Sequence, residues 1–297
     1  MSNVTESNVT ESNITETNIT ETNINQSDTS QSGVIQITQD EHVRTIKLNR
    51  PEKMNALSQE LAWGVVNAVA DAALDDDTWI IGLTGTGKAF CAGLDLTSAE
   101  EAANPSGMSK QDEFLDDIGW VGRFCRDLRY KCDKPIVAGV NGVAVGAGLS
   151  LALSADIRIM ARGARLMAGY PRIGGSPDGG MSYTLSQLIG YEGALRFLLE
   201  NRTVYGEEAK EMGLVGEVVD DDSFAERFAE YCQQLTNLSP ITGRSSKRVV
   251  RAATAHNDLE GHLRYELHNI RRAFSSNDGQ EARAAFLQKR DPKFNGT

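Results

Sequence analysis

The sequence predicts an α/β protein that follows a low-complexity tail and continues into an all-helical extension. Short apolar runs bounded by turn residues, at 79–85 and 136–140, are typical of strands buried on both faces. Stretches with helical periodicity alternate with these runs, which indicates β-α-β units around a mostly parallel sheet. From residue 191 onward the signals are helical only.

The first 32 residues form a polar repeat. Asn-Val-Thr-Glu-Ser occurs twice and Asn-Ile-Thr-Glu-Thr follows twice over residues 3–22, and a degenerate copy continues to about Ser32. One Val or Ile in every five residues cannot build a core, so we expect a disordered tail over 1–32. The tail has five acidic and no basic residues, and the net charge of the chain is −11. The remainder is therefore also acidic, which disfavours nucleic acid as a partner.

We expect the fold to begin at Gly33, with a core over 33–220 and a C-terminal helical region over 221–297. Ser58 is placed to cap the first helix. The expected elements are, in order, strands 34–37 and 43–48, helix 59–74, strand 79–85, a helix from about 111 to 130, strand 136–140, helix 149–154, strand 157–160, and helical segments near 181–189, 191–200, 206–212, 222–236, 240–255, 258–274 and 278–289.

Several classes of protein are disfavoured by composition. No stretch approaches the roughly 18 apolar residues of a membrane span and no signal-peptide profile is present, so we expect a cytoplasmic protein without a membrane partner. The four cysteines lack C-x-x-C spacing, which favours free thiols and no metal site. A Ser-His-Asp triad is disfavoured because no histidine lies between His42 and His256 and no G-x-S-x-G occurs.

Two Gly-containing loops, 88–96 and 141–148, each follow a predicted strand. Small residues let a ligand approach the backbone, and the helix opening near Gly146 directs free N–H groups towards it. Two such loops side by side can form an oxyanion hole, although the glycines can also serve only tight turns and close packing. Their G-x-x-x-G-x-G order differs from the dinucleotide fingerprint, which disfavours nicotinamide chemistry.

Four motifs in this order resemble the signatures of the crotonase (enoyl-CoA hydratase/isomerase) superfamily. They are Arg50-Pro51-Glu52-Lys53-Met54-Asn55-Ala56-Leu57, Phe90-Cys91-Ala92-Gly93-Leu94-Asp95-Leu96, Lys134-Pro135-Ile136-Val137-Ala138-Gly139-Val140-Asn141-Gly142, and Gly146-Ala147-Gly148 followed by Ala155-Asp156. The resemblance spans about 34–294. It implies a crotonase-like spiral of ββα turns, a C-terminal all-α trimerisation region, and a homotrimer or a hexamer formed as a dimer of trimers.

The resemblance also implies an acyl-CoA substrate, with coenzyme A as part of the substrate and no permanently bound cofactor. It implies that the thioester carbonyl accepts hydrogen bonds from the N–H groups of Leu94 and Ala147. The implied contacts to CoA are Lys53, Asn55, Ala56, Leu57 and Ala92, together with Phe286 and Lys289 contributed by an adjacent subunit.

The family's hydratases use two glutamates, and their positions correspond to Ser150 and Tyr170 in this chain. Neither residue can act as a carboxylate, so hydration is doubtful. Asp178 instead matches the aspartate of dienoyl-CoA and 1,2-epoxyphenylacetyl-CoA isomerases and of 4-chlorobenzoyl-CoA dehalogenase. We therefore predict double-bond or ring isomerisation with Asp178 as acid/base; the alternative is that Asp178 only caps helix 181–189. Two interpretations of Tyr170 stay open, a hydrogen bond to Asp178 or a place in the pocket wall.

Other functions stay open at this point. Asp178 can act as a nucleophile in an acyl-CoA hydrolase or a dehalogenase. The stretch 201–210 resembles the dehalogenase branch, but the histidine near Arg123 and the tryptophan at Tyr170 are missing. The remaining alternatives are an enoyl-CoA hydratase and, in another class, a non-catalytic crotonase-fold binding protein, which the acidic balance and the intact Gly loops disfavour.

Overall fold

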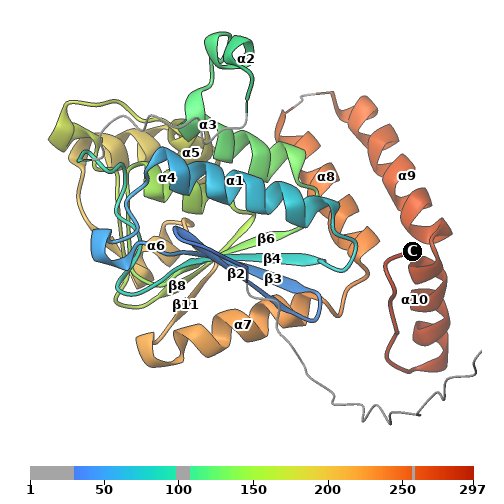
Figure 1. The fold of residues 1–297 in the computed structure, drawn as a ribbon. Coiled ribbons are helices and arrows are strands. Elements are labelled where there is room, and N and C mark those ends of the chain that lie inside the picture. Colours follow the sequence, from blue (N-terminus) through green and yellow to red (C-terminus); the bar gives the residue numbers. More distant parts are fainter. Residues whose placement is uncertain (1–29, 98–107, 256–257) are drawn as a thin grey trace, which may run out of the picture.

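The computed structural model describes residues 30–97, 108–255 and 258–297, and two sheets form the centre of the fold (Figure 1). The larger has the strand order β1-β2-β3-β4-β6-β8-β11 and the smaller the order β10-β9-β7-β5. The strands are β1 (Ser30–Ser32), β2 (Ile35–Asp40), β3 (Val43–Leu48), β4 (Ile80–Gly85), β5 (Ala89–Cys91), β6 (Ile136–Val140), β7 (Val143–Val145), β8 (Ile157–Ala161), β9 (Arg165–Met167), β10 (Val204–Tyr205) and β11 (Glu217–Val219).

Helices alternate with strands up to β11, and only helices follow it in the described residues. They are η1 (Pro51–Lys53), α1 (Gln59–Leu74), α2 (Lys110–Phe114), α3 (Gly119–Arg126), the π-helical turn η2 (Asp127–Lys131), α4 (Ala147–Ser154), η3 (Tyr170–Ile173), α5 (Met181–Glu200), α6 (Gly206–Glu211), η4 (Asp221–Ser223), α7 (Phe224–Leu235), α8 (Pro240–Ala255), α9 (Leu259–Ser275) and α10 (Asn277–Gln288). Ser58 caps α1 as predicted, since its side chain accepts the Leu61 N–H.

The chain repeats one unit, in which a strand of the large sheet leads into a short strand of the small sheet and then into a helix. In this way β4 leads to β5, β6 to β7, and β8 to β9. In the large sheet, the strands β3, β4, β6, β8 and β11 pair in parallel and the β1–β2–β3 edge is antiparallel. In the small sheet, β5, β7 and β9 pair in parallel, and β10 pairs with β9 in the antiparallel sense. The predicted mostly parallel sheet and the spiral of ββα turns are confirmed.

The helices cover both faces of the large sheet. In Figure 1, α1, α3 and α4 lie on one face and α7 on the other. The ring of Phe228 on α7 lies so close to β4 and β6 that a Cβ on Gly82 or Gly139 would come within 3.1 or 2.8 Å of it. The helix α7 thus belongs to the packed core, although the expected boundary at 220 placed it with the C-terminal helices. In Figure 1, α9 and α10 stand to the side of the core.

Three expectations about local structure need correction. The helix expected over 111–130 is interrupted between α2 and α3, because Asp116 accepts the Ile118 N–H (3.1 Å) and Gly119 has φ +69°, and α3 then continues directly into η2. The last three residues of the expected tail form β1, which pairs with β2; the rest of that expectation lies outside the described residues. The segments 181–189 and 191–200 are joined in α5 across a kink at Gly190.

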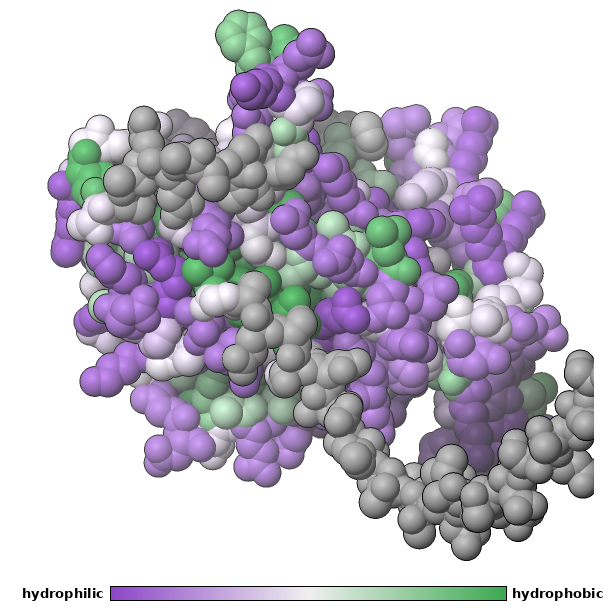
Figure 2. All heavy atoms as spheres, viewed as in Figure 1, coloured by the Kyte–Doolittle hydropathy of each residue, from purple (hydrophilic) through white to green (hydrophobic). Residues whose placement is uncertain are grey.

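Apolar side chains are also found on the surface. Figure 2 shows hydrophobic atoms at the tip of the projection formed by α2, where Phe114 and Leu115 are 89% and 71% exposed. All four cysteines are free and buried, as expected. Within the described ranges, no helix is both long enough and apolar enough to traverse a bilayer.

Candidate active site

The two Gly-containing loops lie side by side because they leave neighbouring parallel strands, β5 and β7. A Cβ on Gly148 would lie 2.3 Å from the carbonyl oxygen of Cys91, so only glycine fits there. In the other direction, Gly93 has φ +101°, and a Cβ on it would lie 3.0 Å from the carbonyl oxygen of Val145. The glycines therefore allow close packing, and this packing brings the two loops together.

Each loop presents a backbone N–H that has no backbone partner. Leu94 forms a parallel bridge with Leu57, in which Leu57 donates to Gly93 (2.7 Å) and Asp95 donates to Leu57 (2.9 Å). This pattern turns the N–H of Leu94 away from Leu57. Ala147 is the first residue of α4, where helix N–H groups lack intrahelical acceptors. Among the described residues, no backbone acceptor takes the N–H of Leu94 or of Ala147.

The first motif supports the loop that carries Leu94. Asn55 is fully buried, accepts the Arg50 N–H (2.8 Å), and donates to the carbonyl oxygens of Thr86 (3.0 Å) and Ala89 (2.8 Å). Its side chain therefore has no free group for CoA, and Leu57 is also buried, at 1% exposure. Of the expected CoA contacts in this segment, Lys53 is exposed and Ala56 is half-buried.

Arg50 connects the same two segments, a role that the sequence did not reveal. Its guanidinium donates to the carbonyl oxygen of Ala56 (2.6 Å) and to the carboxylate of Asp95 (2.9 Å). Hydrogen bonds from Thr97 and from Arg50 hold the pKa of Asp95 far below its usual range. Asp95 is therefore a fixed anion that secures the loop beside Leu94.

Asp178, Tyr170 and Ser150 form one hydrogen-bonded cluster. The Tyr170 hydroxyl donates to Asp178 Oδ1 (2.7 Å), and its oxygen lies 3.2 Å from Ser150 Oγ. Ser150 Oγ also lies 3.0 Å from the carbonyl oxygen of Asp178. Burial and the nearby carboxylate hold the pKa of Tyr170 well above its usual value, so its hydroxyl stays protonated at neutral pH. Ser150 and Tyr170 are thus adjacent, and both contact Asp178.

Asp178 is not a helix cap. The N-cap position of α5 is Gly180, and no side chain caps this helix. Gly179 and Gly180 have φ of +58° and +80°, and a Cβ on Gly179 would lie 2.9 Å from Ser150 Cβ. Gly179 lets the Asp178 loop approach α4 closely, and Gly180 lets it approach Cys125 on α3. The capping alternative is wrong.

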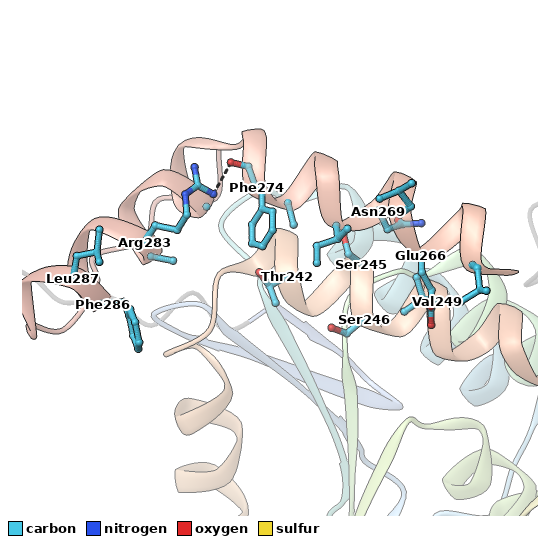
Figure 3. Close-up of a pocket in the computed structure, with 16 residues that line it drawn as sticks. Thr242, Ser245, Ser246, Val249, Glu266, Asn269, Phe274, Arg283, Phe286 and Leu287 are labelled. Carbon is cyan, nitrogen blue, oxygen red and sulfur yellow. Dashed lines mark hydrogen bonds between the residues drawn. The ribbon is translucent and has the colours of Figure 1, made fainter.

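Phe286 and Lys289 lie elsewhere in the chain. Phe286 is 83% exposed and lines a cavity of about 970 Å³ between α8, α9 and α10, together with Leu287, Phe274 and Val249 (Figure 3). None of the other expected site residues lines this cavity. A contact between Phe286 and CoA bound at the loops therefore stays a prediction that involves a second subunit.

Among the described residues, neither a reactive thiol beside the loops nor a cluster of metal-binding side chains is found. Burial raises the pKa of the Cys91 thiol to about 12, so this cysteine beside the loops is neutral and a poor nucleophile. In the part of the chain that the structure describes, no group of three or more His, Cys, Asp or Glu side chains is placed to hold a metal ion.

Comparisons with known proteins agree with this architecture. The enoyl-CoA hydratase/isomerase family model matches residues 38–297. The chain is 33% identical over 261 residues to 1,2-epoxyphenylacetyl-CoA isomerase of Escherichia coli (strain K12), covering 86% of this chain and 96% of that protein. It is 33% identical over 259 residues to a probable enoyl-CoA hydratase of Rhodobacter capsulatus, covering 86% and 95%.

A solved structure of similar fold is the enoyl-CoA hydratase from Polaromonas sp. JS666. It superimposes with a TM-score of 0.79 at 28% identity, covering 89% of this chain and 100% of that one. Since the family model covers nearly all of the described residues, the chain belongs to the enoyl-CoA hydratase/isomerase (crotonase) superfamily.

Proposed function

We propose that the protein isomerises an acyl-CoA thioester, with Asp178 as the group that moves the proton. The observation that carries the proposal is the hydrogen bond from Tyr170 to Asp178 Oδ1 (2.7 Å). It belongs to a cluster that includes Ser150, and the resemblance to the family matches Ser150 and Tyr170 with the two hydratase glutamates. A carboxylate held in this way can remove a proton from one carbon and return it to another.

In the proposed reaction, Asp178 takes a proton from a carbon conjugated with the thioester. The electron pair moves to the carbonyl oxygen, and the N–H groups of Leu94 and Ala147 stabilise the enolate. Loss of one such donor typically costs about 3 kcal/mol in the transition state. The protonated Asp178 then returns the proton at a second carbon, so substrate and product have equal mass.

Hydration fits the side chains less well. Addition of water needs a group that activates the water and a group that protonates carbon. Ser150 and Tyr170 are buried, and the pKa of Tyr170 is raised, so neither is a base at neutral pH. The relative named 1,2-epoxyphenylacetyl-CoA isomerase supports the choice of isomerisation and points to ring as well as double-bond substrates.

The test is a panel of trans-2-enoyl-CoA, 3-enoyl-CoA, aryl-CoA and epoxide-containing acyl-CoA thioesters, followed by mass spectrometry. Isomerisation leaves the mass unchanged, hydration adds about 18 Da, and hydrolysis releases free CoA. We expect Asp178→Asn to lower kcat by about 100-fold or more, the usual contribution of an acid/base group. The matched control is Asp222→Asn, an exposed carboxylate on η4. Full activity of Asp178→Asn would refute the proposal.

The second candidate is nucleophilic attack by Asp178, because Tyr170 orients a single carboxylate in the way expected of the dehalogenase tryptophan. A nucleophilic carboxylate incorporates solvent oxygen when its ester or anhydride is hydrolysed. A single turnover in ¹⁸O-water distinguishes the two functions. Release of CoA or halide with ¹⁸O in Asp178 would replace the isomerase proposal.

We also propose that the protein assembles as a homotrimer or as a dimer of trimers. The cavity between α8, α9 and α10 supports this, since Leu267, Phe274 and Phe286 line it and are 47%, 53% and 83% exposed. Apolar surface of this kind is typical of protein interfaces. Light scattering measures the mass, and a monomer at micromolar concentration would contradict the proposal.

A further inference from the structure

We infer that Ser150 is a positioning residue whose hydroxyl accepts a hydrogen bond from Tyr170 when Asp178 carries the substrate proton on the oxygen that faces Tyr170. The inference rests on the proposed role of Asp178 as acid/base and adds a residue to it. It follows from the number of donors and acceptors in the cluster, and from the burial of Ser150 and Tyr170.

The cluster is a chain of oxygen atoms. Asp178 Oδ1 lies 2.7 Å from the Tyr170 hydroxyl oxygen, which lies 3.2 Å from Ser150 Oγ. Ser150 Oγ in turn lies 3.0 Å from the carbonyl oxygen of Asp178 and 3.3 Å from that of Gly146. Ser150 and Tyr170 are 1% and 5% exposed, so water does not readily replace either partner.

When Asp178 is ionised, each hydroxyl proton in this chain of oxygen atoms has an acceptor. The single hydroxyl proton of Tyr170 points to the carboxylate. The single hydroxyl proton of Ser150 points to one of the two carbonyl oxygens. Tyr170 keeps its proton because burial raises its pKa.

When Asp178 carries the substrate proton on Oδ1, the oxygen that lies 2.7 Å from the Tyr170 hydroxyl, the new O–H faces Tyr170 and needs an acceptor. The Tyr170 oxygen accepts that bond if the Tyr170 hydroxyl turns away from the carboxyl group. Ser150 Oγ is then its acceptor, because either atom of this 3.2 Å pair can be the donor. Ser150 continues to donate to a carbonyl oxygen, so no buried donor is left unpaired in either state.

Ser150 also connects the loop of Asp178 to α4, the helix that begins at Ala147, one of the two expected oxyanion donors. It lies on α4, whose first residue is Ala147, and it bonds to the main chain of Asp178. Loss of the hydroxyl therefore removes an acceptor for Tyr170 and a contact that locates Asp178.

Few other titratable groups contact this loop in the described part of the chain. Tyr170 reaches Asp178 from η3, and the sulfur of Cys125 on α3 lies against Gly180. Arg123, also on α3, is paired with Asp116 (2.7 Å). A change in the pH profile on removal of the Ser150 hydroxyl is therefore expected to report on the Tyr170–Asp178 pair.

The experiment measures kcat, KM and the pH dependence of kcat/KM for Ser150→Ala. In this variant, ionised Asp178 still accepts the hydrogen bond from Tyr170. When Asp178 is protonated, however, the Tyr170 hydroxyl has lost Ser150 Oγ as its acceptor. We expect kcat to fall about tenfold, the effect of one buried hydrogen bond, with KM nearly unchanged. The acidic limb of the profile, which reports the base of the free enzyme, should move about one unit to lower pH.

Two further variants identify the cause. Ser154→Ala removes a buried hydroxyl one turn later on α4, which donates to the carbonyl oxygen of Ser150 (2.7 Å), and should leave the acidic limb in place. In a Tyr170→Phe background, Ser150→Ala should no longer shift this limb, because the two residues act as one unit.

The inference would be overturned if Ser150→Ala left the acidic limb of the kcat/KM profile unchanged. It would also be overturned if Ser150→Ala shifted this limb as much in the Tyr170→Phe background as in the wild type. The proposed function has a separate test. If Asp178→Asn is inactive while Ser150→Ala keeps the wild-type profile, only the inference about Ser150 fails. If Asp178→Asn is fully active, the proposed function fails first.

Discussion

Replacement of Gly148 by Ala tests whether the contact between the two loops supports catalysis. The added Cβ would lie 2.3 Å from the carbonyl oxygen and 2.7 Å from the sulfur of Cys91, whereas ordinary contacts begin at 3.4 Å. Cys91 must therefore move by about 1 Å, and Leu94 follows it three residues later. A displacement of this size near reacting groups costs about 100-fold in rate.

The assay compares kcat/KM on the best substrate of the panel with the free energy of unfolding in urea. We expect kcat/KM of Gly148→Ala to fall about 100-fold. Stability should fall by at most about 1–3 kcal/mol, because overpacking is partly offset by the better helix propensity of alanine. The protein should therefore remain folded while it loses activity.

Gly64→Ala is the matched control, because this glycine also lies in a helix, α1. A Cβ there would meet only side-chain atoms of Ile35, at 3.5 Å or more. Activity should not change, and stability should rise by about 0.5–1 kcal/mol. If Gly148→Ala kept activity within about threefold of wild type, close packing of Gly148 against Cys91 would not be needed to position the reacting groups.

The other predictions concern the acid/base loop, the first motif and the C-terminus. Gly179→Ala should lower kcat at least about tenfold, because its Cβ would push the Asp178 loop away from Ser150; wild-type kinetics would show that this approach is not needed. Asn55→Ala should destabilise the fold by about 2–4 kcal/mol in urea unfolding, because the Thr86 carbonyl oxygen and the Arg50 N–H lose their partner and the Ala89 carbonyl oxygen loses the shorter of its two side-chain hydrogen bonds. An effect on KM alone would instead indicate a ligand contact. Hydrogen bonds from Arg290 lower the pKa of Glu281 to about 2, so its contribution to stability is complete above pH 4.5 and is lost as the pH falls towards 2. The difference in unfolding free energy between wild type and Glu281→Gln should shrink over this range, and a constant difference would contradict the assignment.

Much of the fold could be predicted because the signals are local. The run 136–140 is strand β6 as predicted, and Ser58 caps α1. Apolar runs, periodicity and capping residues act within a few positions along the chain. The helix expected over 111–130 was wrong because a competing local structure forms there, in which Asp116 accepts the Ile118 N–H and Gly119 has a positive φ.

The short strands of the small sheet were not predicted for a related reason. Strands β5 and β7 have three residues each and exist through pairing with each other and with β9. Three residues carry too little periodicity to distinguish a strand from a loop. The loops were nevertheless recognised by their glycines, since close approach of two backbones restricts residue type strongly.

The sequence by itself determined the α/β class, the family motifs and the absence of glutamate at positions 150 and 170. The sequence also suggested the hydrogen bond between Tyr170 and Asp178, which the structure contains. Only the tertiary structure decided that Ser150 contacts both of these residues, and that the Asn55 side chain is used for hydrogen bonds within the loop. The physical reason is distance along the chain. Conformational preference is set by neighbours, whereas hydrogen bonds between residues 8 to 34 positions apart depend on how helices and loops pack.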